Sequence, residues 1–267
     1  MKTESRFQCA KWIGLILPIL MQASPSSWAG NDYEARLGIG IGSTASYPGS
    51  DETVWVPLPL LEVNLRHETT VLRASFADGL ELAHYVQGGP WLVALGLCPG
   101  ESRERDGFEA WGETHEHSRQ AKEILADLPD TTSDMILRGT LARDMGFALF
   151  GISLGLHPIE IEDNEDVTGL TAMAFCARRL ILSPSLEAEG LLGLDAMDEE
   201  YASAWFYGSN HGLRAAVADL RCTWTCWENS GLSGEVCLTR WLGEAADAPS
   251  TLQELQVEVM LYAFHKF

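Results

Sequence analysis

The last sixteen residues of the chain, Leu252–Phe267, alternate apolar and polar side chains at every second position. Such alternation predicts a β-strand with one apolar face. A closing strand that ends in an aromatic residue is typical of outer-membrane β-barrels, and an ordinary last strand of a soluble sandwich is the alternative. In hydrocarbon a sheet must close on itself, because unpaired strand edges cannot be satisfied there. We expect the assembly signal of such a barrel at Leu261, Ala263 and Phe267.

The same alternation recurs along the chain in segments of about ten residues separated by turn residues. It predicts an all-β fold, an antiparallel transmembrane β-barrel of about twelve strands, because short and long connections alternate as they do in outer-membrane barrels. Ten strands is the alternative, since Pro57 and Pro59 interrupt the second segment and the fourth segment is short. The expected strands lie near residues 33–43, 54–65, 68–76, 79–86, 91–98, 133–143, 147–157, 168–178, 179–195, 212–225, 230–242 and 252–267.

The N-terminus has the organisation of a secretory signal peptide. Three basic residues precede an apolar run over Trp12–Ala23, and Ser27 and Ala29 are small residues at the two positions that a signal peptidase reads. We therefore expect cleavage between Ala29 and Gly30, which removes residues 1–29 and leaves residues 30–267 as the exported barrel. An N-terminal anchor is the alternative, but the run is shorter than the roughly 20 apolar residues that a spanning helix needs.

Acidic residues dominate the charge of the chain. It has 38 Asp and Glu against 18 Lys and Arg, a formal net charge of -20, so it would repel nucleic-acid phosphates and we exclude nucleic-acid binding. The acid is concentrated in the expected loops, where it suits solvated outer loops near divalent cations or simply keeps the protein soluble. Of the cysteines, Cys222 and Cys226 are expected on one strand, about 13 Å apart, which is too far for a disulfide.

The polar faces of the expected strands carry charges of both signs, and these faces would line the lumen of a barrel. We expect the charges to pair into a network that partly fills the lumen. Two alternatives stay open, a lumen that is simply packed and a narrow aqueous path with weak preference for cations. The candidate lumen charges are Arg36, Arg138, Glu187, Glu189, Asp219, Arg221, Glu235 and Glu258.

No motif for metal-dependent or nucleotide-dependent catalysis stands out. The sequence has no H-E-x-x-H and no P-loop pattern, and we expect neither enzymatic activity nor a cofactor. His115 and His117 could together reach a metal ion, but an H-x-H within a charged run is more often part of a solvated loop. The longest expected connection is Pro99–Thr132, and loops of this length are usually functional or disordered. We expect it outside the cell, where it folds over the lumen or meets an outside partner.

Two segments resemble motifs of the MipA/OmpV family of outer-membrane proteins. The first resembles the family's Y-x-G-S-D and P-x-P opening, and it comprises Tyr47, Gly49, Ser50, Asp51, Pro57 and Pro59. The second, just before the last expected strand, resembles L-L-G-D-A-A-D-S-P, and it comprises Gly243, Ala245, Ala246, Asp247 and Pro249. The resemblance runs from about residue 33 to residue 267.

The resemblance implies an outer-membrane barrel without known catalysis. Members of the family are described as scaffolds that bring a murein-cleaving transglycosylase together with a murein synthase, and others are linked to adhesion or to small-solute passage. The implied partners are outer-membrane lipid and either murein-processing enzymes or an extracellular surface. An interaction or scaffolding protein is the favoured function, a narrow small-solute pore comes second, and an outer-membrane hydrolase comes last. The sequence departs from the family in its cysteines, in His265 where an aromatic is usual, and in a hydrophilic insertion at Asp106–Lys122.

Overall fold

The computed structural model describes residues 32–76, 78–86, 89–100, 102–103, 107–110, 113–117, 119–126, 128–162, 166–206 and 211–267. The expected signal peptide, with its cleavage point between Ala29 and Gly30, lies outside these residues. Among the described residues, no helix has the length and apolar character needed to cross a membrane.

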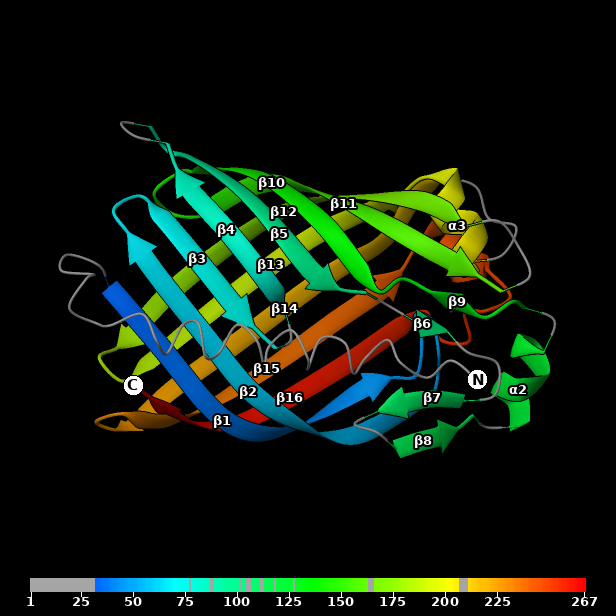
Figure 1. The fold of residues 1–267 in the computed structure, drawn as a ribbon, viewed down its shortest axis with the longest axis horizontal. Helices are drawn as coiled ribbons and strands as arrows, with labels where there is room; N and C mark the ends of the chain where they lie inside the picture. Colours follow the sequence, from blue (N-terminus) through cyan, green and yellow to red (C-terminus); the bar gives the residue numbers. More distant parts are fainter. Residues whose placement is uncertain are drawn as a thin grey trace.

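Twelve antiparallel strands form the wall of a closed barrel (Figure 1). The first strand pairs with the last, where Arg36 lies opposite Lys266, and the pairing of β10 with β11 completes the circle. The prediction of an all-β barrel of about twelve strands is therefore confirmed, and the alternative of ten is set aside. The wall strands are β1 (Asp32–Ala45), β2 (Thr53–His67), β3 (Thr70–Ser75), β4 (Gly79–Tyr85), β5 (Trp91–Pro99), β10 (Met135–Asp144), β11 (Leu149–Ile161), β12 (Val167–Ser183), β13 (Leu186–Met197), β14 (Gly212–Trp227), β15 (Ser230–Trp241) and β16 (Leu255–Lys266).

The other elements gather at one end of the barrel, which we call the loop end (Figure 1). At the opposite end, the turn end, the strands are joined by short turns such as residues 68–69, 184–185 and 228–229. The expected loop at 99–132 contains structure of its own, including a separate two-stranded hairpin. The elements of the loop end are β6 (Ser102–Arg103), β7 (Gly107–Ala110), β8 (Glu113–Glu116), α2 (Arg119–Leu125), β9 (Thr131–Thr132), α3 (Glu199–Phe206) and α4 (Gly243–Asp247).

The wall is apolar outside and polar inside. Ile39, Leu95 and Leu192 point outward and are 69%, 61% and 64% exposed, whereas Ser233 and Glu235, on the inward face of β15, are buried. A soluble barrel would bury the apolar face, so the exposed apolar band fits surrounding hydrocarbon. Periodicity alone cannot distinguish these two arrangements, because both give the same alternation.

The boundary between β12 and β13 differs from the sequence expectation. The expected junction at Arg178–Arg179 is wrong, because β12 continues to Ser183 and the turn lies at Pro184 and Ser185. Pro184 has no N–H to donate to a ladder, and the Ser183 hydroxyl accepts a hydrogen bond from the Ser185 N–H at 3.3 Å. The correction places Arg179 inside the barrel, opposite Glu189.

Pro57 and Pro59 lie within β2, although proline removes ladder donors. The Leu61 carbonyl oxygen accepts from the Phe76 N–H on the β3 side of the strand. Odd-numbered residues of β2 therefore direct their backbone polar groups toward β3 rather than β1. In the described residues, β3 pairs with β2 only over residues 62–67 of β2. Both prolines lie outside this range, where the β3 side of β2 has no strand to bond. Their missing N–H groups consequently cost no wall hydrogen bond.

The residues expected to form the assembly signal lie at the closing seam. Leu261 and Ala263 face outward on β16, opposite Ile41 and Ile39 of β1. The backbone N–H of Phe267 donates to the Ala35 carbonyl oxygen at 2.9 Å. This placement shows how the last strand joins the first, while the role of these residues in assembly stays a prediction.

Candidate functional site: the lumen network and the loop-end cap

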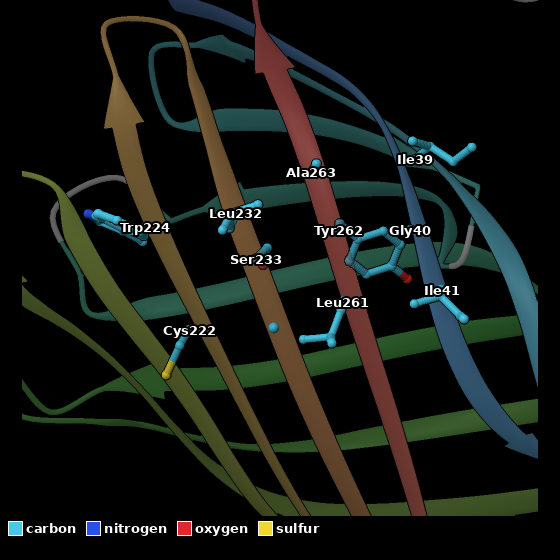
Figure 2. Close-up of a pocket in the computed structure, with 11 residues that line it drawn as sticks. Ile39, Gly40, Ile41, Cys222, Trp224, Leu232, Ser233, Leu261, Tyr262 and Ala263 are labelled. Atoms are coloured by element: carbon cyan, nitrogen blue, oxygen red, sulfur yellow. The ribbon is translucent and has the colours of Figure 1, made fainter.

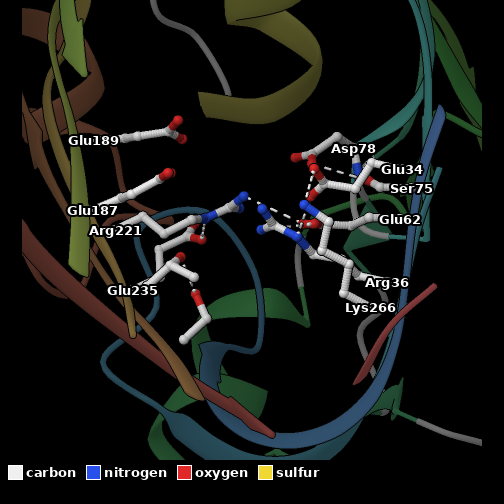
Figure 3. A network of polar contacts seen from close by, with 12 residues as sticks. Glu34, Arg36, Glu62, Ser75, Asp78, Glu187, Glu189, Arg221, Glu235 and Lys266 are labelled. Carbon is white, nitrogen blue, oxygen red and sulfur yellow. Dashed lines mark hydrogen bonds and ion pairs between the residues drawn. The ribbon is translucent and has the colours of Figure 1, made fainter. Parts of the chain in front are cut away.

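Ion pairs extend across the lumen from β1 and β2 to β14 (Figure 3). Arg36 Nη1 lies 3.6 Å from Glu62 Oε2, and Arg221 Nη1 lies 3.4 Å from Glu62 Oε1. Arg221 Nε also pairs with Glu235 at 2.6 Å. One carboxylate thus lies between two guanidinium groups that come from different parts of the wall. We call Glu34, Arg36, Glu62, Arg221, Glu235 and Lys266 the lumen network.

Near the turn end the network continues through Glu34. Its carboxylate accepts from Arg36 Nε at 2.8 Å and from Lys266 Nζ at 2.7 Å. A second group of charges lies on β12 and β13, where Arg179 pairs with Glu187 at 2.5 Å and with Glu189 at 3.4 Å. In Figure 3, Glu187 and Glu189 lie beside Arg221, facing the Glu34 side of the network. The lumen therefore holds alternating charges rather than a surface of one sign.

The structure brings together only some of the candidate lumen charges. Arg36, Arg221 and Glu235 belong to the lumen network, and Glu187 and Glu189 form the neighbouring group with Arg179.

The other three candidates are not members of these ion pairs. Asp219 lies two residues before Arg221 on the inward face of β14. Glu258 lies toward the loop end, where Oε1 accepts from the Ala45 N–H at 3.4 Å. Arg138 lies on β10, between Gly96 and Gly155 of the neighbouring strands.

Sequence reasoning missed Glu62 and Arg179. Glu62 stands on the polar phase of β2, directly opposite Arg36, and extending the alternation of that segment through its prolines would have identified it. Arg179 was missed because the expected strand boundary fell beside it. Both residues lie within expected strands, at 54–65 and 179–195, on the phase of the alternation that faces the lumen.

The first family motif lies at the loop end, against residues near the other end of the chain. The Gly49 carbonyl oxygen accepts from the N–H groups of Leu252 and Gln253, at 2.7 and 3.0 Å. Gly49 has φ of +89°, and a Cβ there would lie 3.0 Å from Thr251 Cα, so a larger residue is disfavoured on both grounds. The first motif therefore packs directly against the segment that follows the second.

The side chain of Gln256, on β16, holds the first motif in place through hydrogen bonds. Its Nε2 donates to the carbonyl oxygens of Tyr47 and Ser50, at 3.2 and 3.3 Å, and its Oε1 accepts from Trp241 Nε1 at 3.1 Å. The Ser50 hydroxyl in turn accepts from the Glu52 N–H at 3.0 Å. These bonds hold the first motif over the inner rim of the wall.

The remaining motif residues have varied surroundings. Ala245 is the fully buried residue of α4, and Ala246 beside it is partly buried. Gly243 opens the helix with φ of +54°, which favours glycine. Asp51, Asp247 and Pro249 are exposed, so no packing in the structure explains them.

An apolar cluster lies under α3 and α4. Tyr201, Trp205 and Phe206 of α3 are all at most 2% exposed, and they pack with Trp241 and Ala245. The rings of Phe206 and Trp241 have centroids 5.4 Å apart. We call this cluster, together with segments 46–52 and 242–254, the loop-end cap.

Arg103 ties the long segment between β5 and β10 to this cap. Its guanidinium donates to the backbone carbonyl oxygens of Trp205 and, at 3.0 Å, of Ala204, and also to Thr131 Oγ1 at 3.1 Å. These carbonyls lie in the last turn of α3, where a cation is favourable to the helix dipole. Burial lowers the pKa of Arg103 to about 10, so the group remains protonated at neutral pH.

Tyr47 connects the same segment to the first motif. Tyr47 is 3% exposed and packs with Leu125, the last residue of α2, and with Leu128 just after it. Burial raises the pKa of Tyr47 to about 12. The His117 ring lies edge-on to it, with centroids 5.8 Å apart. His117 Nδ1 also lies 2.7 Å from Glu52 Oε2. His117, one of the two histidines considered as metal ligands, thus packs within the cap. Within the described residues, no group of three or more His, Cys, Asp or Glu side chains is placed to hold a metal ion.

A G-x-S-x-G pattern, which the sequence expectations overlooked, occurs at Gly151–Gly155. In serine hydrolases this pattern forms a sharp strand-to-helix turn that exposes the serine. Here it lies in the middle of β11, Ser153 is buried, and its Oγ lies 3.1 Å from Thr140 Oγ1. His157 on the same strand lies 2.9 Å from Thr171 Oγ1 instead. The arrangement is that of cross-strand pairs, not of a nucleophile elbow.

Solved structures with a similar course of the chain include an outer-membrane channel from Pseudomonas putida F1, with TM-score 0.44, 12% identity and coverage of 88% of this chain and 95% of that one. The translocator domain of the autotransporter NalP from Neisseria meningitidis has TM-score 0.41 and 9% identity, covering 100% and 99%. OmpT of Vibrio cholerae in its trimer form has TM-score 0.40 and 7% identity, covering 89% and 99%. None of the curated proteins compared with this chain matches it.

The family model described as MltA-interacting protein MipA matches residues 37–267. This range includes almost the whole wall from β1 to β16, together with both segments of the loop-end cap. The match does not depend on the structural likenesses above. The chain therefore belongs to the MipA family and is an outer-membrane β-barrel.

Proposed function

We propose that this protein is a non-catalytic interaction barrel, a scaffold at the cell envelope whose lumen is too obstructed for steady passage of solutes. The observation that carries the proposal is the position of Glu62 between Arg36 and Arg221. Arg221 stands on β14, four places around the wall from the β2 strand that carries Glu62. A chain of ion pairs that crosses the lumen occupies the space that a solute would need.

The loop-end cap supports the same proposal. Its aromatic cluster is buried. The carbonyl oxygens at the end of α3 accept from Arg103 and also from the hydroxyls of Thr131 and Ser250. Such packing favours a barrel that stays closed at this end. Some residues of both family motifs, such as Gly49 and Ala245, contribute to this packing.

The partner that we propose is a murein-processing enzyme, following the family description of an MltA-interacting protein. We place both termini in the periplasm, at the turn end, where β1 begins and β16 ends, so such an enzyme would meet this end. That end exposes apolar side chains in and beside its turns, and Ile181 and Trp227 are 72% and 71% exposed. Ile181 lies two residues before the end of β12 and Trp227 is the last residue of β14, and exposed apolar groups at the rim of the wall are suited to a protein contact. An outside surface would instead meet the acidic loop end, which is the adhesion alternative.

Site-specific photo-crosslinking tests the partner and the face together. A crosslinking residue at Ile181 or Trp227 should capture a murein-processing enzyme in intact envelopes, and the matched position Glu199 at the loop end should not. Capture from Glu199 alone would replace the scaffold proposal with the adhesion alternative. Sequencing of the mature N-terminus tests export in the same material, with Gly30 expected as the first residue.

A narrow pore is the runner-up, favoured by the partial exposure of Arg179 and Glu189 in the lumen, 57% and 50% by side chain. Planar-bilayer recording distinguishes the two functions. We expect no steady conductance from the native barrel, and conductance steps from the Glu62→Ala variant, which breaks the link across the lumen. Steps of equal size from both proteins, with weak cation preference, would favour the pore.

A further inference from the structure

The outer surface of the wall is hollowed where β14, β15, β16 and β1 lie side by side (Figure 2). The hollow is a groove of about 540 Å³. Its sides are apolar side chains of the membrane-facing surface, and Ile39, Leu261 and Trp224 among them are between 49% and 69% exposed. The groove is therefore open to hydrocarbon and not to the lumen.

The groove exists because Gly234 has no side chain to fill it, and the inner face of the wall behind the groove is covered. Gly234 lies in the outward row of β15 between Leu232 and Val236. A Cβ at Gly234 would lie 3.2 Å from Leu261 Cδ2, so a side chain there would occupy the hollow. On the inner face the Tyr262 ring covers Gly40, since a Cβ at Gly40 would lie 2.5 Å from Tyr262 Cδ1. No passage through the wall is needed to explain the volume.

The groove has a polar group at one end. Two residues beyond Ala263, on the same outward row of β16, stands His265. Its Nδ1 lies 2.8 Å from Ser230 Oγ. Ser230 is the first residue after the tight turn at 228–229. The His265 ring lies edge-on to Phe267, with centroids 4.7 Å apart. When the Ser230 hydroxyl donates to Nδ1, Nε2 carries the proton and is a donor toward the surroundings.

We propose that this groove binds one acyl chain of a phospholipid, with the lipid phosphate beside His265. Lipid hydrocarbon already surrounds this face of the wall, and a hollow left empty loses dispersion contacts. The lining is mostly apolar, and His265 lies beyond its turn-end edge, an arrangement that matches a molecule with one charged end and one apolar chain.

The test uses native mass spectrometry on delipidated barrel titrated with phosphatidylethanolamine. Gly234→Leu fills the groove, and Gly139→Leu is its matched control. Gly139 also faces outward, on β10, and a Cβ there would meet only Leu95 Cδ2, at 3.9 Å. We expect Gly234→Leu to weaken retention of the lipid about tenfold, a change of one decade in the dissociation constant, and Gly139→Leu to leave it unchanged. Gly234→Ala, a smaller change, should give a smaller loss.

A second variant tests the headgroup. His265→Ala should weaken retention of phosphatidylethanolamine but not of diacylglycerol with the same chains, and His265→Gln should recover part of the loss, because it keeps a donor. Heat-modifiable migration on a gel shows that each variant is folded.

Equal retention of the lipid by Gly234→Leu and Gly139→Leu would overturn the proposal. Unchanged retention of phosphatidylethanolamine by His265→Ala would overturn the placement of the phosphate. A native dimer that Gly234→Leu converts to monomer would assign the groove to self-association instead.

Discussion

The side-chain amide of Gln256 donates a hydrogen bond to the backbone carbonyl oxygen of Tyr47, 209 positions earlier in the chain, across 3.2 Å. The same side chain bonds Ser50 and Trp241. One residue of the last wall strand thus holds the first family motif in place. The barrel wall and the loop-end cap are therefore coupled through a side chain that faces neither lipid nor solvent.

Gln256→Ala should loosen the cap without opening the wall. It leaves two buried carbonyl oxygens and the Trp241 indole N–H without this partner, at a cost of about 1–3 kcal/mol. Limited proteolysis should cut within segments 46–52 or 242–254 at lower protease concentrations than in the native protein. Gln253→Ala is the control, because the Gln253 side chain is exposed. Equal cleavage of the two variants would contradict the coupling.

Tyr47→Phe should change the alkaline stability. Burial raises the pKa of Tyr47 to about 12, so between about pH 10 and pH 12 the unfolded chain releases this proton and the folded protein keeps it. The buried Tyr47 hydroxyl therefore contributes up to about 2–3 kcal/mol to the free energy of unfolding. This contribution is fully present below about pH 10 and is lost as the pH rises through about 12.

Denaturant unfolding at pH 9 and pH 12 measures this difference. The native protein should lose more stability than Tyr47→Phe between these two values. Burial lowers the pKa of Arg103 to about 10, which acts in the opposite direction on the stability of both proteins, so the difference between them reports Tyr47 together with its interaction with Arg103. Parallel curves would show that the Tyr47 hydroxyl is not buried in solution.

Deleting Phe267 should reduce the amount of assembled barrel in the membrane. Its backbone N–H bonds the Ala35 carbonyl oxygen at the closing seam, and the edge of the last strand must be recognised and paired during closure. Heat-modifiable migration of the membrane fraction measures the folded amount. Phe267→Tyr keeps the aromatic ring and the backbone, and it should assemble normally. Native levels after the deletion would exclude Phe267 from the assembly signal.

Deleting Gly107–Glu116 should leave barrel assembly intact. This hairpin pairs β7 with β8 and, within the described residues, joins no wall strand. The cut ends before His117 and α2, which pack against Tyr47. Association with a murein-processing enzyme should be unchanged, whereas adhesion to an outside surface should be lost if the hairpin makes that contact. Failure to assemble would mean that the hairpin supports the wall.

The wall could be predicted from the sequence because its signal is local. Alternation such as that of Leu255 to Ala263 recurs every second residue, and it is present whether or not the strand has found its neighbours. The same local signal predicted that Arg36, Arg221 and Glu235 share the polar face. Glu62 and Arg179 lie on the same polar phase, within the expected strands 54–65 and 179–195, so the alternation could have identified them as well.

Only the tertiary structure decided which charges meet and how the loop end is closed. Arg221 is linked to Glu62 because closure of the sheet brings β14 and β2 to a common lumen, and no spacing in the sequence encodes that distance. Likewise, Gln256 reaches Tyr47 and Arg103 reaches α3 across long connections. Periodicity sets the faces of each strand, whereas the register and curvature of the closed barrel select the partners, since these depend on all twelve strands at once.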